Sequence, residues 1–414
     1  MESLTQLETA RQRAIEAAGP SFCFAQSVNN VDDQCQTLRG GAQRHVAATR
    51  QLGLTRSALF LPLFGCSGRC SGGLPSIGNV IAYYVLARAA ALAGRLDFFF
   101  MMQDCPKAQH VLQLLPKVAA APTVGGAPNY AEAATVACAG YPGMLAHKTG
   151  SWTAYLPRFR EDLRAGLSAW ASRTRFPPSD APYDDVAIHF RCGDVMKRQH
   201  PEYGILPLEA IAALVPAGRA TTVGLVTMNF HRSCSTCNGW LAGAPGRRQH
   251  NCPGSQWLAL CSCACAAVAD ELVLGLQRLR PLARVAVRYT DGPLGAWARL
   301  LFARVATVCM PSTFCLWPTL AAVGRGHFVA SPVWPNASAL SAGLPGFSVI
   351  SEPPFVSYDS LPRGFRKSGK RKRRPRFDGN CTTTPEVARA WVRERLSGRE
   401  DLQRAAGDER SERT

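Results

Sequence analysis

Short apolar runs alternate with longer amphipathic stretches along much of the chain. In the first half, 57–64 (SALFLPLF) is typical of a buried strand, 77–93 predicts a helix, and 96–102 (LDFFFMM) predicts the next strand. A Gly- and Ser-rich stretch separates the first strand from the helix, and this order indicates a βαβ unit with parallel strands. A second, amphipathic helix is predicted over 152–175.

A more regular alternation begins after 173–185, where Pro and Asp residues end the helix and favour a turn. We predict strands over 186–190, 222–228, 284–290, 306–310 and 326–331, and helices between them near 207–214, 256–281, 294–304 and 313–323. This alternation predicts a doubly wound α/β domain. A last helix, over 385–397, is expected to pack back across both domains.

These elements divide the chain into five expected parts. They are a helical or irregular extension over 1–50, a first α/β domain over 51–180, a second over 181–350, a basic, disordered segment over 351–384, and a C-terminal helix and tail over 385–414. With 414 residues, of which 47% are hydrophobic, the chain is large enough for two cores.

The net charge of +18 is unevenly spread. Residues 363–376 (RGFRKSGKRKRRPR) carry nine Lys or Arg and no acid, which is half of the excess. The segment lacks interleaved aromatic residues, so we interpret it as a solvated tail, and a nucleic-acid contact is the alternative. The positive excess in the rest of the chain suits an anionic ligand.

The 16 cysteines favour an oxidising compartment, where disulfides form, although their partners cannot be assigned from sequence. A zinc site at Cys234, Cys237, Cys252 and Cys261 is the alternative, but its irregular spacing does not match a zinc ribbon. Asn336 and Asn380 begin N-glycosylation triplets, which fits the same compartment. Because the sequence shows neither a membrane span nor the apolar region of a signal peptide, we expect any membrane anchor to lie outside it.

Three stretches contain candidate binding chemistry. His189, Arg191, Gly193 and Asp194 follow the strand predicted at 186–190, at an edge where ligands bind in open α/β sheets. Arg can bind a phosphate through two parallel hydrogen bonds, Gly allows positive φ, and Asp can orient the Arg. Alone, this pattern is more typical of an ordinary salt bridge at a strand end.

The other two stretches each resemble an ordinary turn when taken alone. Ser312 and Thr313 follow a strand and open a helix, where hydroxyl and backbone N–H groups cap the helix or bind an anion. Gly73, Gly78 and Asn79 belong to the Gly-rich stretch between the first strand and its helix.

In combination and in this order, the three stretches resemble the fucosyltransferase superfamily. The matching residues are Gly73, Leu74, Gly78 and Asn79; His189, Arg191, Gly193 and Asp194; and Ser312, Thr313, Phe314 and Trp317. The resemblance implies a GT-B-like fold of two Rossmann-like domains facing a cleft. It also implies inverting, metal-independent transfer of fucose from GDP-fucose to a glycan or glycoprotein acceptor, with no cofactor, in the Golgi or secretory-pathway lumen.

The resemblance also assigns roles to individual residues. Arg191 and Asp194 are the expected catalytic residues, with Arg191 stabilising the charge on the departing GDP. Donor binding is expected at His189, Gly193, Ser312, Thr313, Phe314, Gly78, Asn79 and Asp291. Candidates for a general base are Asp104, Asp194, His200 and Glu202, with none favoured.

The sequence departs from the family pattern in three places. Cys192 stands where relatives often carry a second Arg, the acid before the 294–304 helix is replaced by Asp291 further upstream, and the Gly-rich stretch carries an extra Pro-Ser-Ile. Two other functions therefore stay open: a nucleic-acid-binding α/β protein that uses 363–376, and a GT-B-like protein that binds a nucleotide or glycan without turnover.

Overall fold

The computed structural model divides the chain into two compact units. Unit 1 comprises Met1–Phe176, Leu316–Ala321 and Val333–Pro345, and unit 2 comprises Pro177–Cys315, Ala322–Pro332 and Gly346–Thr414. The residues that the structure describes are 9, 22–25, 58–62, 77–94, 97–102, 111–116, 118–120, 134–139, 155–193, 195–196, 201–217, 221–227, 256–290, 292–331, 338–341, 344–352, 354–362 and 383–396.

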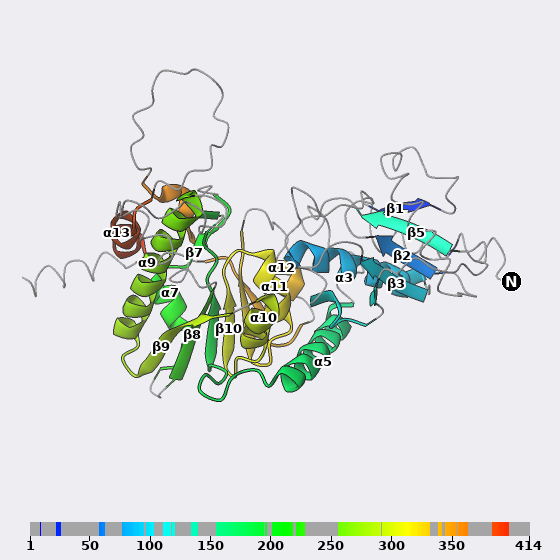
Figure 1. The fold of residues 1–414 in the computed structure, drawn as a ribbon, viewed down its shortest axis with the longest axis horizontal. Helices are drawn as coiled ribbons and strands as arrows, with labels where there is room; N and C mark the ends of the chain where they lie inside the picture. The colour runs from blue at the N-terminus through cyan, green and yellow to red at the C-terminus, as the bar shows by residue number, and fades with distance from the viewer. Residues whose placement is uncertain are drawn as a thin grey trace, which may run out of the picture. The chain divides into compact units, whose positions relative to one another are not determined.

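Unit 2 contains a six-stranded parallel sheet (Figure 1). Its strands lie in the order β12 (Phe347–Ile350), β11 (Arg325–Val329), β10 (Ala306–Cys309), β6 (Val186–His189), β8 (Thr221–Thr227) and β9 (Ala283–Tyr289). The six strands can be numbered 1 to 6 in chain order, with β6 as strand 1 and β12 as strand 6. From the β9 edge to the β12 edge they then lie in the order 3-2-1-4-5-6, which is the order of Rossmann-like sheets. The predicted α/β class is therefore confirmed, and unit 2 is compatible with a Rossmann-like fold.

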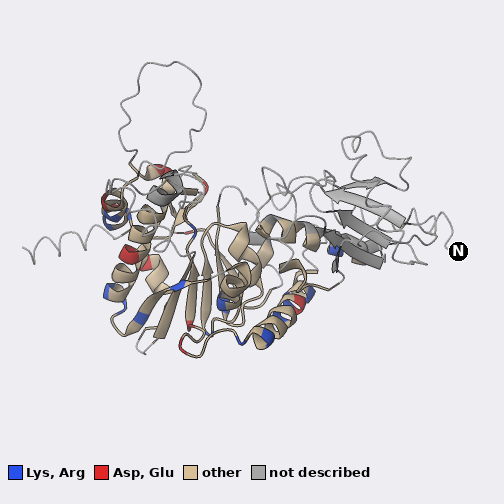
Figure 2. Cartoon of the chain, viewed as in Figure 1, with Lys and Arg blue, Asp and Glu red and all other residues tan. Residues whose placement is uncertain are grey.

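The central strands follow from runs of buried, uncharged residues. Every residue of β6 and β10 is buried, and β6, β8 and β10 contain no Lys, Arg, Asp or Glu (Figure 2). A strand that is covered on both faces needs such a continuous run and does not show alternation. The five strands predicted in this region are confirmed to within one or two residues at each end.

The helices of unit 2 connect successive strands of this sheet. They are α7 (Leu208–Ala213), α9 (Gln256–Leu279), α10 (Pro293–Leu301) and α11 (Thr313–Leu320), all four of which the sequence predicts. Helix α9 packs against β9 and α7, and α10 packs against β6, β8 and β10. The residues of α11 divide between the units, because Leu316–Ala321 cluster with unit 1.

The C-terminal helix α13 (Pro385–Arg395) is confirmed and belongs to unit 2. The Thr384 hydroxyl accepts a hydrogen bond from the Val387 N–H at 3.4 Å, which caps the helix. Helix α13 packs mainly on α9, where the Arg393 guanidinium meets the Glu271 carboxylate in two hydrogen bonds of 2.6 and 3.0 Å. These contacts lie within unit 2, and the expected packing across both domains stays a prediction.

Unit 1 contains a five-stranded sheet in the order β1 (Phe22–Ala25), β5 (Ala134–Ala139), β2 (Ala58–Pro62), β3 (Asp97–Met102) and β4 (Val118–Ala120). Strand β1 is antiparallel to β5, and the other pairs are parallel. Helix α3 (Ile77–Gly94) connects β2 to β3, which confirms the predicted βαβ unit.

Helix α5 (Leu156–Thr174) is amphipathic, as predicted. Its buried residues recur at helical spacing and form one apolar face: Leu156, Phe159, Leu163, Leu167 and Ala171. The short α12 (Ser338–Ser341) also belongs to unit 1. Among the described residues, no helix combines the length and apolar character that crossing a membrane requires.

The expectation of a disordered segment over 351–384 is wrong for its first part. Strand β13 (Val356–Ser357) pairs with β7 (Gly204–Ile205), and η6 (Tyr358–Ser360) follows it. The hydrophobic effect explains why this part of the segment is folded, because the side chains of Tyr358 and Leu361 are almost fully buried. The basic residues 363–376 lie outside the described residues.

The expected helical or irregular extension over 1–50 is also wrong in one place. Phe22–Ala25 forms β1, an edge strand of the unit 1 sheet. Its hydrogen bonds come from pairing with β5, more than 100 positions further along the chain, and a local sequence pattern does not report such a partner.

Candidate functional site

The loops that follow β6 and β10 meet at one point of the unit 2 sheet. The two strands are adjacent, with His189 opposite Cys309 at their carboxyl ends. The chain order of the strands reverses between β6 and β10, and in such sheets ligands bind beyond the carboxyl ends at this switch point. The loop after β6 carries Arg191, and the loop after β10 carries Ser312.

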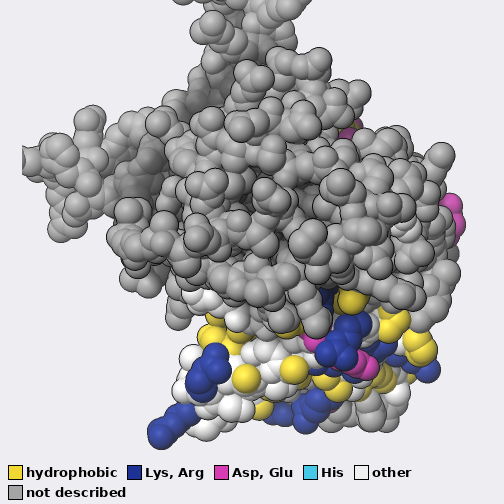
Figure 3. All heavy atoms as spheres, turned by 90° about the vertical axis from the view of Figure 1, so that its right-hand side faces the viewer, with side chains coloured by type: hydrophobic (Ala, Val, Ile, Leu, Met, Phe, Trp, Pro, Cys, Tyr) yellow, Lys and Arg dark blue, Asp and Glu magenta, His cyan; other side chains and the backbone are white. Residues whose placement is uncertain are grey.

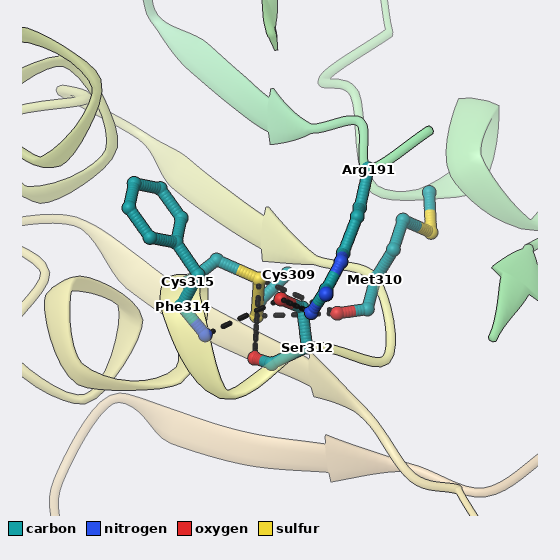
Figure 4. The surroundings of a disulfide bond; sticks show 6 residues. All are labelled: Arg191, Cys309, Met310, Ser312, Phe314 and Cys315. Carbon is teal, nitrogen blue, oxygen red and sulfur yellow. Dashed lines mark hydrogen bonds between the residues drawn. A yellow bond between two sulfur atoms is a disulfide. The ribbon is translucent and has the colours of Figure 1, made fainter. Parts of the chain in front are cut away.

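Arg191 and Ser312 are in direct contact across this point (Figure 4). The Arg191 Nη1 donates a hydrogen bond to the Ser312 Oγ at 3.3 Å. The guanidinium carbon also lies 4.6 Å from the centre of the Tyr203 ring, in a cation–π arrangement. The half-buried cation is thus aimed at the loop that carries Ser312.

Ser312 connects this contact to the start of α11. Its Oγ accepts a second hydrogen bond, from the Phe314 N–H at 3.2 Å, and its side chain is almost fully buried. Since the oxygen accepts in both contacts, the hydroxyl hydrogen has no acceptor among the described residues. Thr313, also buried, follows Ser312 and begins the helix, and the start of a helix is a position where backbone N–H groups can bind an anion.

His189 ends β6 and is only 7% exposed. Burial, assisted by the nearby Arg191 charge, lowers the pKa of His189 to about 3, so the imidazole is neutral at physiological pH. The ring packs on Phe314, with ring centres 5.4 Å apart. The buried Nδ1 of His189 has no hydrogen-bond partner among the described residues. Buried polar atoms are usually hydrogen-bonded, so this nitrogen is available for a hydrogen bond at the end of the strand.

The backbone after β6 is held in place by several elements. The Phe190 carbonyl accepts a hydrogen bond from the Thr227 hydroxyl at 2.9 Å, and the Arg191 carbonyl accepts one from the Tyr358 hydroxyl at 2.6 Å. Gly193 has a φ of 76°, as the sequence analysis anticipates for this glycine, and its N–H donates to the Cys265 sulfur at 2.9 Å.

Two disulfides close the two loops of the site. Cys192, next to Arg191, is bonded to Cys265 of α9, and Cys309 is bonded to Cys315, which places Ser312 within a closed turn (Figure 4). All four cysteines are buried. Cys192 is turned toward α9 and bonded there, so its side chain is part of the core of this unit. These bonds involve none of the cysteines of the zinc alternative, because Cys234, Cys237, Cys252 and the side chain of Cys261 lie outside the described residues.

The structure brings together six of the predicted site residues in unit 2: His189, Arg191, Gly193, Ser312, Thr313 and Phe314. Asp194, Asp291, the side chain of Asn79, and the possible bases Asp104 and His200 lie outside the described residues. Gly78 belongs to unit 1, in the first turn of α3. It is buried, and its carbonyl accepts a hydrogen bond of 2.6 Å from the Trp317 indole, so its visible role is in packing.

Sequence reasoning missed two tyrosines at this site. The ring of Tyr203, which is not among the predicted site residues, lies against the Arg191 guanidinium, and Tyr358 belongs to the segment expected to be disordered. A sequence signal for Tyr358 does exist. Phe355, Tyr358 and Leu361 recur every three residues, which indicates a short buried turn.

No family model matches the chain, and no curated protein or solved structure is significantly similar to it.

Proposed function

We propose that this chain is a glycosyltransferase that moves fucose from GDP-fucose to a glycan or protein acceptor, with inversion and without a metal ion. The observation that carries the proposal is the contact between Arg191 and Ser312 at the switch point of a parallel sheet. A diphosphate needs a cation and several hydrogen-bond donors at one place, and this edge of the sheet offers them.

The choice of sugar and nucleotide rests on the motif order. A Gly-Asn stretch, H-x-R-x-G-D and S-T-F-x-x-W occur in this order, as they do in the fucosyltransferase superfamily. The proposal includes the GT-B arrangement, with the nucleotide on unit 2 and the acceptor on unit 1. It also includes the lumen of the secretory pathway, which the buried disulfides support because such bonds persist in oxidising compartments.

In the proposed reaction an acceptor oxygen attacks C1 of fucose while the bond from C1 to the GDP oxygen breaks. The bonding electrons move onto the β-phosphate, and the acceptor proton leaves to a base or to water. The Arg191 guanidinium, with the Ser312 hydroxyl and the backbone N–H groups at the start of α11, stabilises the charge that develops on GDP. Of the possible bases, Glu202 is described, in the turn before β7, and its role stays a prediction.

The first test is the affinity of Arg191→Ala for GDP, measured by titration calorimetry. We expect binding to weaken at least tenfold, since a hydrogen bond to a charged group contributes about 1.5–3 kcal/mol. Arg304→Ala is the matched control, because Arg304 is an exposed arginine just before β10, at the opposite end of the strand from Ser312. A folded Arg191→Ala protein with unchanged GDP affinity would contradict the proposal.

The second test is a screen of several sugar nucleotides for release of the free nucleotide. Faster release from GDP-fucose than from the others, and its loss in Arg191→Ala, are the expected results. GDP binding without release from any donor would favour a nucleotide-binding protein without turnover. Salt-sensitive RNA or DNA binding that is lost when 363–376 is deleted would favour the nucleic-acid alternative. On the face drawn in Figure 3, the described Lys and Arg side chains lie among hydrophobic and uncharged ones.

A further inference from the structure

Tyr358 contacts both partners of the cation–π pair in the candidate site. Its hydroxyl donates a hydrogen bond to the Arg191 carbonyl at 2.6 Å, and its backbone N–H donates one to the Tyr203 carbonyl at 3.0 Å. The Tyr203 ring in turn lies 4.6 Å from the Arg191 guanidinium carbon. One residue therefore fixes the backbone that carries the cation and the backbone that carries the ring beside it.

Tyr358 is itself held rigidly. Its side chain is fully buried, and its ring stacks on Trp391 of α13 with 5.9 Å between ring centres. The Trp391 indole N–H donates to the Ser360 hydroxyl at 2.9 Å, within the same η6 turn as Tyr358. The tyrosine is thus enclosed between the turn that carries it and the C-terminal helix, so its hydroxyl has little freedom to follow a moving loop.

We propose that Tyr358 is a positioning residue for Arg191, a role that rests on the function proposed above. The Arg191 carbonyl lies beyond the last residue of β6, where the sheet no longer fixes the chain direction. The hydrogen bond from Tyr358 sets the orientation of this peptide, and with it the direction in which the guanidinium leaves the backbone. Its contact with Ser312 then exists before a ligand arrives, so less ordering is needed on binding.

A purely structural role for Tyr358 makes different predictions. Removing the hydroxyl would then lower the stability of the fold and leave the Arg191 loop and its ligand affinity unchanged. Tyr84 provides a matched control, because it is also fully buried and its hydroxyl also donates to a backbone carbonyl, that of Pro116, at 2.8 Å. Tyr84 lies in unit 1, whereas the Arg191 loop belongs to unit 2.

The experiment compares Tyr358→Phe with Tyr84→Phe in the full chain by amide hydrogen exchange, before any ligand is added. We expect faster exchange over 190–196 in Tyr358→Phe alone, because the loop loses one of its attachments. Equal exchange over 190–196 in both variants and the unaltered protein would overturn the proposal. This readout does not depend on GDP binding, so it remains decisive even where the proposed function fails.

The second readout is affinity for two probes, GDP and inorganic pyrophosphate. In Tyr358→Phe we expect both affinities to fall by a similar factor of about five, the effect of one neutral hydrogen bond, since the change acts on the phosphate contact. In Tyr84→Phe we expect both to be unchanged. GDP binding by the unaltered protein with no loss in Tyr358→Phe would overturn the positioning role, whereas absence of GDP binding in the unaltered protein would overturn the proposed function.

Discussion

His189 and Arg191 are two positions apart but differ in charge at neutral pH. Burial removes the imidazole from water and holds the pKa of His189 far below its ordinary value, so the ring is neutral beside the Arg191 cation. The end of β6 therefore presents a neutral ring packed on Phe314 and a cation directed at Ser312. A charged His189 beside Arg191 would add repulsion and a desolvation cost.

A pH dependence of stability follows from the pKa of about 3 for folded His189, compared with about 6.5 in an unfolded chain. Between these two values the unfolded chain binds more protons, so stability falls as the pH falls through this window. We expect the unaltered protein to lose about 2 kcal/mol more than His189→Phe between pH 7.5 and pH 5.

Urea unfolding at several pH values measures this difference. The His327 imidazole, whose pKa is also lowered by burial, is present in both proteins, so the difference between their slopes isolates His189. Identical slopes would show that His189 is not buried as a neutral ring.

Among the elements, the two disulfides differ in the length of chain that they close. Cys192–Cys265 spans 73 residues and joins the loop after β6 to α9, whereas Cys309–Cys315 spans six and closes a single turn. A longer loop restricts the unfolded chain more, so the first bond is expected to stabilise the fold more strongly.

The prediction is a loss of about 4 kcal/mol for the double Ser variant of Cys192 and Cys265, and about 2 kcal/mol for that of Cys309 and Cys315. Denaturant unfolding of the oxidised proteins measures both values. Equal losses would mean that packing around the sulfurs, and not the length of the closed loop, determines the contribution of each bond.

How far the sequence predicts these elements depends on burial. The central strands β6 and β10 are predictable because every residue in them is buried. Strand β12 lies at the sheet edge with three of its four residues half-exposed, and it escapes prediction because its pattern is neither continuously apolar nor alternating. The two-residue strands β7 and β13 are too short to leave a pattern at all.

The same reasoning applies to the candidate site. Arg191 and Ser312 could be predicted because each follows a recognisable strand, and the rule for ligand sites in parallel sheets then applies. The spacing of apolar residues around Tyr358 predicts only a buried turn, and its contact with Arg191 could not be predicted because the two residues lie 167 positions apart. The pairing of the cysteines cannot be predicted from the sequence for the same reason.

At the scale of the whole molecule, the two ends of the unit 2 sheet carry different groups of polar residues. The carboxyl ends carry the candidate site, while Asp184, which precedes β6 at the opposite end of that strand, forms a charged cluster with Arg288 and Arg299. Asp184, 1% exposed, receives hydrogen bonds of 2.6–3.1 Å from Arg288 and lies 3.7 Å from the buried Arg299. We expect changes at this end to affect stability and changes at the other end to affect binding.

Asp184→Asn tests this separation. The substitution leaves the buried Arg299 without its carboxylate, and breaking a buried ion pair typically costs about 3–5 kcal/mol. We expect a loss of this size in chemical unfolding, with GDP affinity unchanged under conditions where the variant is folded. A weakened GDP affinity in the folded variant would show that the two ends of the sheet are coupled.

The attachment of Arg191 to Tyr358, and of Tyr358 to Trp391, has a consequence for biosynthesis. Every strand of the six-stranded sheet has been synthesised once the ribosome has released the chain as far as Ile350. Folding can begin at that stage, because domains fold from the N-terminal side during synthesis. The nascent protein at that stage still lacks Tyr358 and the helix that encloses it. A chain that ends between Ile350 and Tyr358 would therefore contain the whole sheet but would lack the hydrogen bond from Tyr358 to the Arg191 carbonyl.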